Sequence, residues 1–213
     1  MNDGLSDRDL LRVRARFLDL LKSFFQGPPD GEKISRWRGI FAALAGERIN
    51  PQLDAAIRAV GDLLARTTLE DIAAEYDLLF VDPYSRYQIV LNGSYYLDGR
   101  SFGPSLAGYR ELLREAQLIR QADVDEPEDS LPLMLDAFIG LIEMEKEQAD
   151  QGRMLQAALL ERFLLPVARE IHARMQENSK ADFYRHCMQF LCRYLELEEA
   201  IAREDGEQPH ILH

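Results

Sequence analysis

The side chains best suited to chemistry in this sequence are carboxylates gathered in front of an apolar run. The segment ADVDEPEDSLPLML, residues 122–135, holds five acidic residues and two prolines. Acids favour the positive end of a helix dipole and Pro suits a first helical turn, so capping explains one or two of these acids. Because capping leaves the others unexplained, the segment indicates a contact with a positively charged partner.

The negative charge is concentrated in two regions of the chain. Residues 123–147 hold nine acids against one lysine, and residues 196–207 hold six acids against one arginine. In the first region, Asp136, Glu143 and Glu147 fall on one side of a helical wheel, opposite an apolar stripe. Such a charged stripe is usually the solvated side of a surface helix. Like charges at this spacing disfavour a helix, so a basic partner stays open as the second explanation.

A second group of candidate residues lies in the segment DPYSRYQIVLNGSYYLDGRSFG, residues 82–103. A connection of ~20 residues without regular structure is uncommon inside a compact domain and is often functional. The segment is rich in large aromatic side chains, namely Tyr84, Tyr87, Tyr95, Tyr96 and Phe102. These rings either pin the segment to the core or together line a groove.

Catalytic signatures are missing from the sequence. There is no glycine-rich phosphate loop, no H-E-x-x-H and no G-x-S-x-G, and the chain has only four histidines. A helical bundle with a carboxylate metal site is the enzyme alternative, but no Glu-x-x-His pair of the kind such sites use lies within the predicted helices. We therefore expect neither an enzyme nor a bound metal or cofactor.

The composition limits the class of protein. The chain has 213 residues, of which 46% are hydrophobic, and a formal net charge of −12. This acidity argues against a nucleic-acid binder, which needs a basic face for phosphate contacts. No apolar run approaches the ~18 residues of a membrane span, and the N-terminus lacks the clean apolar stretch of a signal peptide. We expect a cytoplasmic protein without stable membrane insertion, in which Cys187 and Cys192 are ordinary buried thiols.

Helical periodicity dominates the chain and predicts an all-α fold. Apolar residues recur at three- and four-residue spacing over 6–26, 32–47, 51–66, 69–81, 104–121, 129–148, 152–177 and 180–204. The pattern predicts about eight to ten helices in a single compact domain over residues 1–213, with one long irregular aromatic loop. Possible halves, 1–121 and 128–205, would be joined by an acidic linker, so a monomer and a dimer both remain open. Pro166 should kink or interrupt its helix.

Helix boundaries also carry local signals. Asn50 followed by Pro51 is typical of a capped helix start, and Thr68 with Asp71 resembles a capping box. Ser179 with Asp182 has the same spacing and predicts that the last helix starts near residue 180.

Several blocks together resemble the TorD/DmsD/NarJ family of redox-enzyme maturation chaperones. They are, in order, EYDLLFVDP, SYY, SFGPSLAGYRELLREAQL, EPEDSL, LLERFLLPVAREI and FYRHCMQFLCRYLELE. The likeness runs over residues 75–199, and the coincidence of several blocks in the right order makes it specific. Many members have His where this chain has Ser130, and the Pro expected three residues before Ser94 is Leu91.

The resemblance implies an all-helical cytoplasmic chaperone that binds the twin-arginine signal peptide of a molybdopterin-containing oxidoreductase subunit. Such a chaperone holds the apoenzyme until its cofactor is inserted and so prevents premature export. The signal-peptide site implied by the family's motifs and by the aromatic segment comprises Tyr76, Phe80, Pro83, Tyr84, Tyr87, Ser94, Tyr96, Glu126, Pro127 and Asp129. Carboxylates there would receive arginine guanidinium groups, and the aromatic groove would bury the apolar part of the peptide. A generic acidic scaffold for an unrelated basic protein is the alternative.

Overall fold

The computed structural model describes residues 6–119 and 126–207, and within them the regular structure is helical. The α-helices are α1 (Asp7–Phe25), α2 (Gly31–Leu44), α3 (Pro51–Arg66), α4 (Leu69–Tyr76), α5 (Gly93–Asp98), α6 (Pro104–Glu115), α7 (Leu131–Glu145), α8 (Ala149–Leu159), α9 (Leu165–Glu177) and α10 (Phe183–Glu207). Two π segments, η1 (Asp77–Val81) and η2 (Leu160–Leu164), extend α4 and join α8 to α9. The predicted all-α fold is confirmed.

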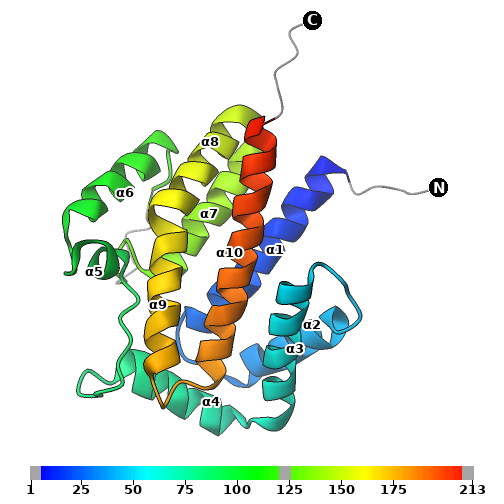
Figure 1. Ribbon diagram of the computed structural model, residues 1–213, viewed down its shortest axis with the longest axis vertical. Helices are drawn as coiled ribbons and strands as arrows, with labels where there is room; N and C mark the ends of the chain where they lie inside the picture. The colour runs from blue at the N-terminus through cyan, green and yellow to red at the C-terminus, as the bar shows by residue number, and fades with distance from the viewer. Residues whose placement is uncertain (1–5, 120–125, 208–213) are drawn as a thin grey trace, which may run out of the picture.

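The helices are arranged around an antiparallel pair formed by α9 and α10 (Figure 1). α1 packs against α7 and α10, so the first helix of the chain joins the C-terminal helices in the core. α2 and α3 lie on one side of the bundle, α5 and α6 lie on the other, and α4 lies across one end. The acidic segment 122–125 and its predicted linker role fall outside the described residues.

Local capping explains several of the helix starts. The Asn50 side chain accepts a hydrogen bond from the Leu53 N–H at 2.9 Å, and Pro51 occupies the first turn of α3. Thr68 Oγ1 accepts from the Asp71 N–H at 3.2 Å and donates to the Asp71 carboxylate at 2.7 Å. Both starts were predicted from the residue types, because a cap satisfies N–H groups that have no partner inside the helix.

The start of α10 was predicted wrongly. It begins at Phe183, and its first N–H groups are capped by a side chain from another helix. Glu75 on α4 accepts from the N–H groups of Asp182, Phe183 and Tyr184 at 2.9, 3.0 and 2.9 Å. A carboxylate at this position suits the positive end of the helix dipole, and burial raises its pKa despite the three N–H donors.

The expected interruption near Pro166 takes the form of a π turn. Pro166 has no N–H to donate, and in the turn before it the Leu165 N–H donates to the Leu160 carbonyl. Along α10, the apolar residues at three- and four-residue spacing are buried at Phe183, Cys187, Phe190 and Tyr194. Both cysteines are buried and unpaired with each other.

Two segments differ from their predicted structure. The helix predicted over 104–121 ends at Glu115, because Gln117 takes a left-handed backbone conformation with φ of 55°. The segment 82–103 was expected to lack regular structure, but it contains α5. The N-cap residue of α5, Asn92, makes no side-chain capping hydrogen bond. Instead, the N–H groups of Gly93 and Ser94 donate to the backbone carbonyl and the carboxylate of Asp129, respectively, and these bonds hold the first turn.

Candidate functional site

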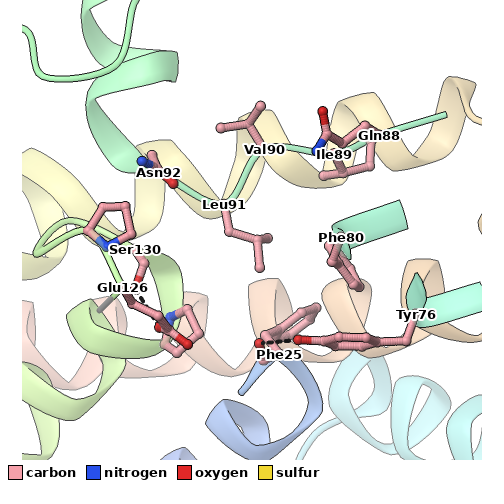
Figure 2. A pocket seen from close by; sticks show the side chains of 12 residues that line it. Phe25, Tyr76, Phe80, Gln88, Ile89, Val90, Leu91, Asn92, Glu126 and Ser130 are labelled. Atoms are coloured by element: carbon pink, nitrogen blue, oxygen red, sulfur yellow. Dashed lines mark hydrogen bonds between the residues drawn. The ribbon is translucent and has the colours of Figure 1, made fainter. Parts of the chain in front are cut away.

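A cleft with a volume of about 260 Å³ opens where the end of α1, the α4–η1 junction, residues 88–92 and the turn before α7 meet (Figure 2). Its lining residues are Phe25, Tyr76, Phe80, Gln88, Ile89, Val90, Leu91, Asn92, Glu126, Pro127, Ser130 and Pro132. Figure 2 shows the aromatic rings toward one end of the cleft and Glu126 with Ser130 toward the other. The cleft therefore has an apolar end and an acidic end.

The aromatic end is built of rings packed against one another. The Phe80 ring lies 5.0 Å from the Tyr76 ring and 6.2 Å from the Phe25 ring, between centroids. Behind it, the buried Tyr184 ring lies 5.2 Å from Phe80. The Tyr76 hydroxyl donates to the Phe25 carbonyl at 3.3 Å, and burial raises the pKa of Tyr76 to about 12. These rings offer apolar contact area at little cost in conformational entropy.

The π segment η1 places Phe80 on the cleft. A π turn inserts an extra residue into the helical repeat and so changes the direction of the side chains that follow it; such turns are frequent at functional sites. Leu79, one residue earlier, is fully buried, whereas Phe80 is partly exposed. The Leu79 carbonyl accepts from the Ile89 N–H at 2.7 Å, which ties η1 to the opposite wall.

The opposite wall is the extended segment 88–92, which is held at one end by the Ile89–Leu79 hydrogen bond and at the other by two bonds to the turn before α7. The Leu131 N–H donates to the Leu91 carbonyl at 2.8 Å, and the Gly93 N–H donates to the Asp129 carbonyl at 2.7 Å. The Leu91 side chain points into the cleft and Val90 points away from it (Figure 2). On the outer side, the Tyr96 hydroxyl donates to the Val90 carbonyl at 2.8 Å.

The acidic end is built by Glu126 and Ser130. The Ser130 hydroxyl donates to Glu126 Oε2 at 3.1 Å, and Ser130 is also the N-cap of α7. The residue that departs from the family pattern thus orients the carboxylate at the cleft. Glu126 is half-buried, and it forms no ion pair with any cation in the described part of the chain. Its negative charge is therefore available to a ligand.

Asp129 and Ser94, which were predicted to bind the peptide, lie away from the cleft. Both are buried, and Asp129 Oδ2 accepts from the Ser94 N–H at 2.6 Å. Ser94 Oγ in turn accepts from the Phe102 N–H at 2.9 Å. The two residues hold α5 against the turn before α7 and do not line the cleft.

The remaining candidates lie around the cleft. Pro83 is exposed, and Tyr84 is 94% exposed in the turn after η1. The Tyr87 carbonyl accepts from Asn178 Nδ2 at 2.7 Å, so this residue fastens the segment to the end of α9. Of the predicted site residues, the cleft brings together Tyr76, Phe80, Glu126 and Pro127.

Several cleft residues were not predicted, among them Phe25, Ile89, Leu91 and Ser130. Phe25 lies 51 residues before Tyr76, in the segment 6–26 for which the apolar spacing predicted only a helix. Only the tertiary structure brings it to the site.

Neither a metal centre nor a membrane span is found in the described part of the chain. No group of three or more His, Cys, Asp or Glu side chains is placed there to hold a metal ion. None of its helices is both long and apolar enough to cross a bilayer.

Comparison with known proteins places this helical bundle among chaperones. The family model described as "Nitrate reductase delta subunit" matches residues 47–173, more than half of the chain. A protein of Haemophilus influenzae named "Probable Tat proofreading chaperone DmsD" is 27% identical over 173 residues, which cover 80% of this chain and 74% of the relative. The matched region contains η1, the extended segment and the turn before α7, which form most of the cleft.

The chain belongs to the TorD/DmsD/NarJ family of redox-enzyme maturation chaperones. The resemblance inferred from the sequence blocks is thereby confirmed.

Proposed function

We propose that this chain binds the twin-arginine signal peptide on the precursor of a molybdopterin-containing oxidoreductase subunit. It would hold the apo form in the cytoplasm until the client's cofactor is inserted, and would so prevent premature export. Family membership and the name of the relative, which refers to Tat proofreading, support the class of client. The observation that carries the proposal is a carboxylate without an ion pair among the described residues, Glu126, in a cleft whose other end is lined by aromatic rings.

The two ends of the cleft match the two parts of such a peptide. Glu126 would accept charge-assisted hydrogen bonds from an arginine guanidinium, and Ser130 keeps its carboxylate oriented for them. The wall of Phe25, Phe80 and Leu91 would bury apolar side chains that follow the arginines. At about 260 Å³ the cleft is smaller than the roughly 300–1,000 Å³ of small-molecule pockets, which suits one or two anchoring side chains of a peptide laid across it.

Peptide titration tests this proposal. A peptide with two consecutive arginines and an apolar segment should bind with a micromolar Kd, on the order of −8 kcal/mol. Added salt should weaken binding because part of it is ionic. The Glu126→Gln variant should bind roughly three- to tenfold more weakly, since a hydrogen bond to a charged group contributes about 1.5 kcal/mol or somewhat less at a partly exposed site.

The controls separate a specific site from a generic acidic surface. The Glu111→Gln variant removes the same charge from an exposed position on α6 and should leave the affinity nearly unchanged. A Lys-Lys peptide and a scrambled peptide should bind more weakly than the Arg-Arg peptide. Equal binding of all three would contradict the proposal and favour the scaffold alternative.

The client is accessible by co-purification from the native cell. The precursor recovered with the chain should carry a twin-arginine leader, and its yield should fall when that leader is deleted. Recovery of the leaderless form at the same yield would place recognition elsewhere on the client.

A further inference from the structure

A second hollow adjoins the cleft and shares Glu126 with it. It has a volume of about 330 Å³ and is lined by Gln26, Tyr109, Leu113, Leu118, Ile119, Glu126, Glu128, Leu133, Asp136 and Ala137. The lining combines aliphatic side chains with three carboxylates, and the Ile119 side chain is 91% exposed. An acidic rim around an apolar floor complements a segment that is cationic and apolar, as the proposed peptide is.

Two of the three carboxylates are paired with cations of the chain itself. Arg110 on α6 donates from Nε to Glu128 Oε2 at 2.8 Å and from Nη2 to Oε1 at 3.0 Å. Lys22 donates to Asp136 Oδ1 at 2.7 Å. Glu126, by contrast, has no ion pair within the described residues. The Arg110 contact is the two-bond geometry with which a guanidinium recognises a carboxylate.

The Arg110–Glu128 pair is placed so that a ligand can exchange with it. The Arg110 side chain is 52% exposed and the Glu128 side chain 26%. Breaking an ion pair this exposed changes the equilibrium constant for peptide binding by no more than about fivefold, so a ligand can displace Arg110 at little cost. Glu128 lies two residues from Glu126 in the same turn, and both carboxylates line this hollow.

We propose that Arg110 competes internally with the bound peptide for Glu128. In the peptide-free protein, its guanidinium occupies Glu128; a second arginine of the peptide displaces it while the first pairs with Glu126. The inference rests on the proposed function. Because the peptide's guanidinium only replaces that of Arg110, the exchange at Glu128 adds little to the affinity for the peptide. Arg110 therefore keeps the peptide complex weaker than it would be if Glu126 and Glu128 could both bind the peptide without competition.

The Arg110→Gln variant tests this competition. It should bind the Arg-Arg peptide up to about fivefold more tightly than the wild type, because Arg110 no longer competes for Glu128. Arg114→Gln is the matched control: Arg114 lies on the same helix, is exposed and forms no ion pair in the described part of the chain. This control removes the same charge and should change the Kd by less than about twofold. Thermal unfolding of each variant verifies that the fold is intact.

A double-mutant cycle identifies the carboxylate involved. In a Glu128→Gln background, the additional change Arg110→Gln should give no gain in affinity. A gain that persists there, or an equal gain in Arg114→Gln, would refute the competition and assign the effect to net charge. If neither the wild type nor Arg110→Gln binds the Arg-Arg peptide at low ionic strength, the proposed function itself fails. If the wild type binds and Arg110→Gln binds no more tightly, only the competition fails.

Discussion

Arg14 on α1 and Glu198 on α10 form a buried ion pair, and the Glu198→Gln substitution should destabilise the fold strongly. Arg14 Nη2 lies 2.7 Å from Glu198 Oε2, and Arg14 Nε lies 3.0 Å from the same oxygen. Glu198 is 2% exposed and Arg14 is 8% exposed. Glutamine keeps the size of the side chain but removes the charge that compensates the guanidinium.

The expected cost can be worked out from the other contacts of Arg14. Removing one partner of a buried ion pair typically costs about 3–5 kcal/mol. Arg14 keeps Glu145 at 3.3 Å and Gln156 at 2.6 Å, so we expect the lower end, about 3 kcal/mol. With an unfolding entropy of about 2.1 cal/mol/K for each of the 213 residues, this corresponds to a fall in Tm of roughly 7 °C.

Thermal and urea unfolding followed by circular dichroism measure this cost. Glu196→Gln is the control on the same helix: Glu196 pairs with Arg193 at 2.8 Å, but its side chain is 35% exposed. The control should cost less than about 1 kcal/mol. Replacing both partners, Arg14→Met with Glu198→Leu, should cost less than Glu198→Gln alone, because no buried charge is left without its main partner. A Tm for Glu198→Gln within about 2 °C of the control would refute the assignment of a buried, charge-compensated pair.

Further predictions concern helix starts, helix packing and one exposed glycine. Glu75→Ala should cost about 1–3 kcal/mol in urea unfolding, since it removes the acceptor of three N–H groups, while the exposed Glu70→Ala should cost a few tenths. Because burial raises the pKa of Glu75, the folded state binds the Glu75 proton more tightly than the unfolded chain does. The Tm of the wild type relative to that of Glu75→Gln should therefore fall as the pH rises above about 4.3. A relative Tm that rises with pH would contradict a raised pKa for Glu75. Gly152→Ala should cost about 1–3 kcal/mol, because its Cβ would lie 2.7 Å from the backbone Cα of Glu145. In Gly39→Ala the new Cβ meets nothing within 4 Å, so this change in α2 should instead stabilise by about 0.5–1 kcal/mol.

The sequence predicted helices best where the signals are local. The predicted ranges 51–66 and 69–81 coincide with α3 and with α4 plus η1, because periodicity and an N-cap specify both. The start of α10 could not be predicted in this way, since its cap comes from Glu75, more than 100 residues earlier. The end of α6 at Glu115 could not be predicted either, because the left-handed backbone that follows it lies at a non-glycine residue, Gln117.

The site residues likewise divide into those that the sequence indicated and those that only tertiary contacts bring to the cleft. The sequence blocks drew attention to Tyr76, Phe80 and Glu126, which the cleft does bring together. Phe25 and Leu91 reach it through tertiary hydrogen bonds of their backbone carbonyls, to Tyr76 Oη and the Leu131 N–H respectively. Residue type and spacing contain no sign of such pairings.

The acidic turn before α7 shows why counting charges overstates a binding site. Of its described acids, Asp129 is buried and accepts from the first turn of α5, and Glu128 holds Arg110. Glu126 differs from both, since among the described residues it accepts a hydrogen bond from the Ser130 hydroxyl, forms no ion pair and lines both hollows. Three carboxylates that look alike in the sequence thus have different roles: Asp129 is structural, Glu128 is paired with Arg110, and Glu126 can accept a ligand. Peptide affinity should accordingly respond more to Glu126→Gln than to Glu128→Gln, because Glu128 must first release an internal arginine before it can bind one from the peptide.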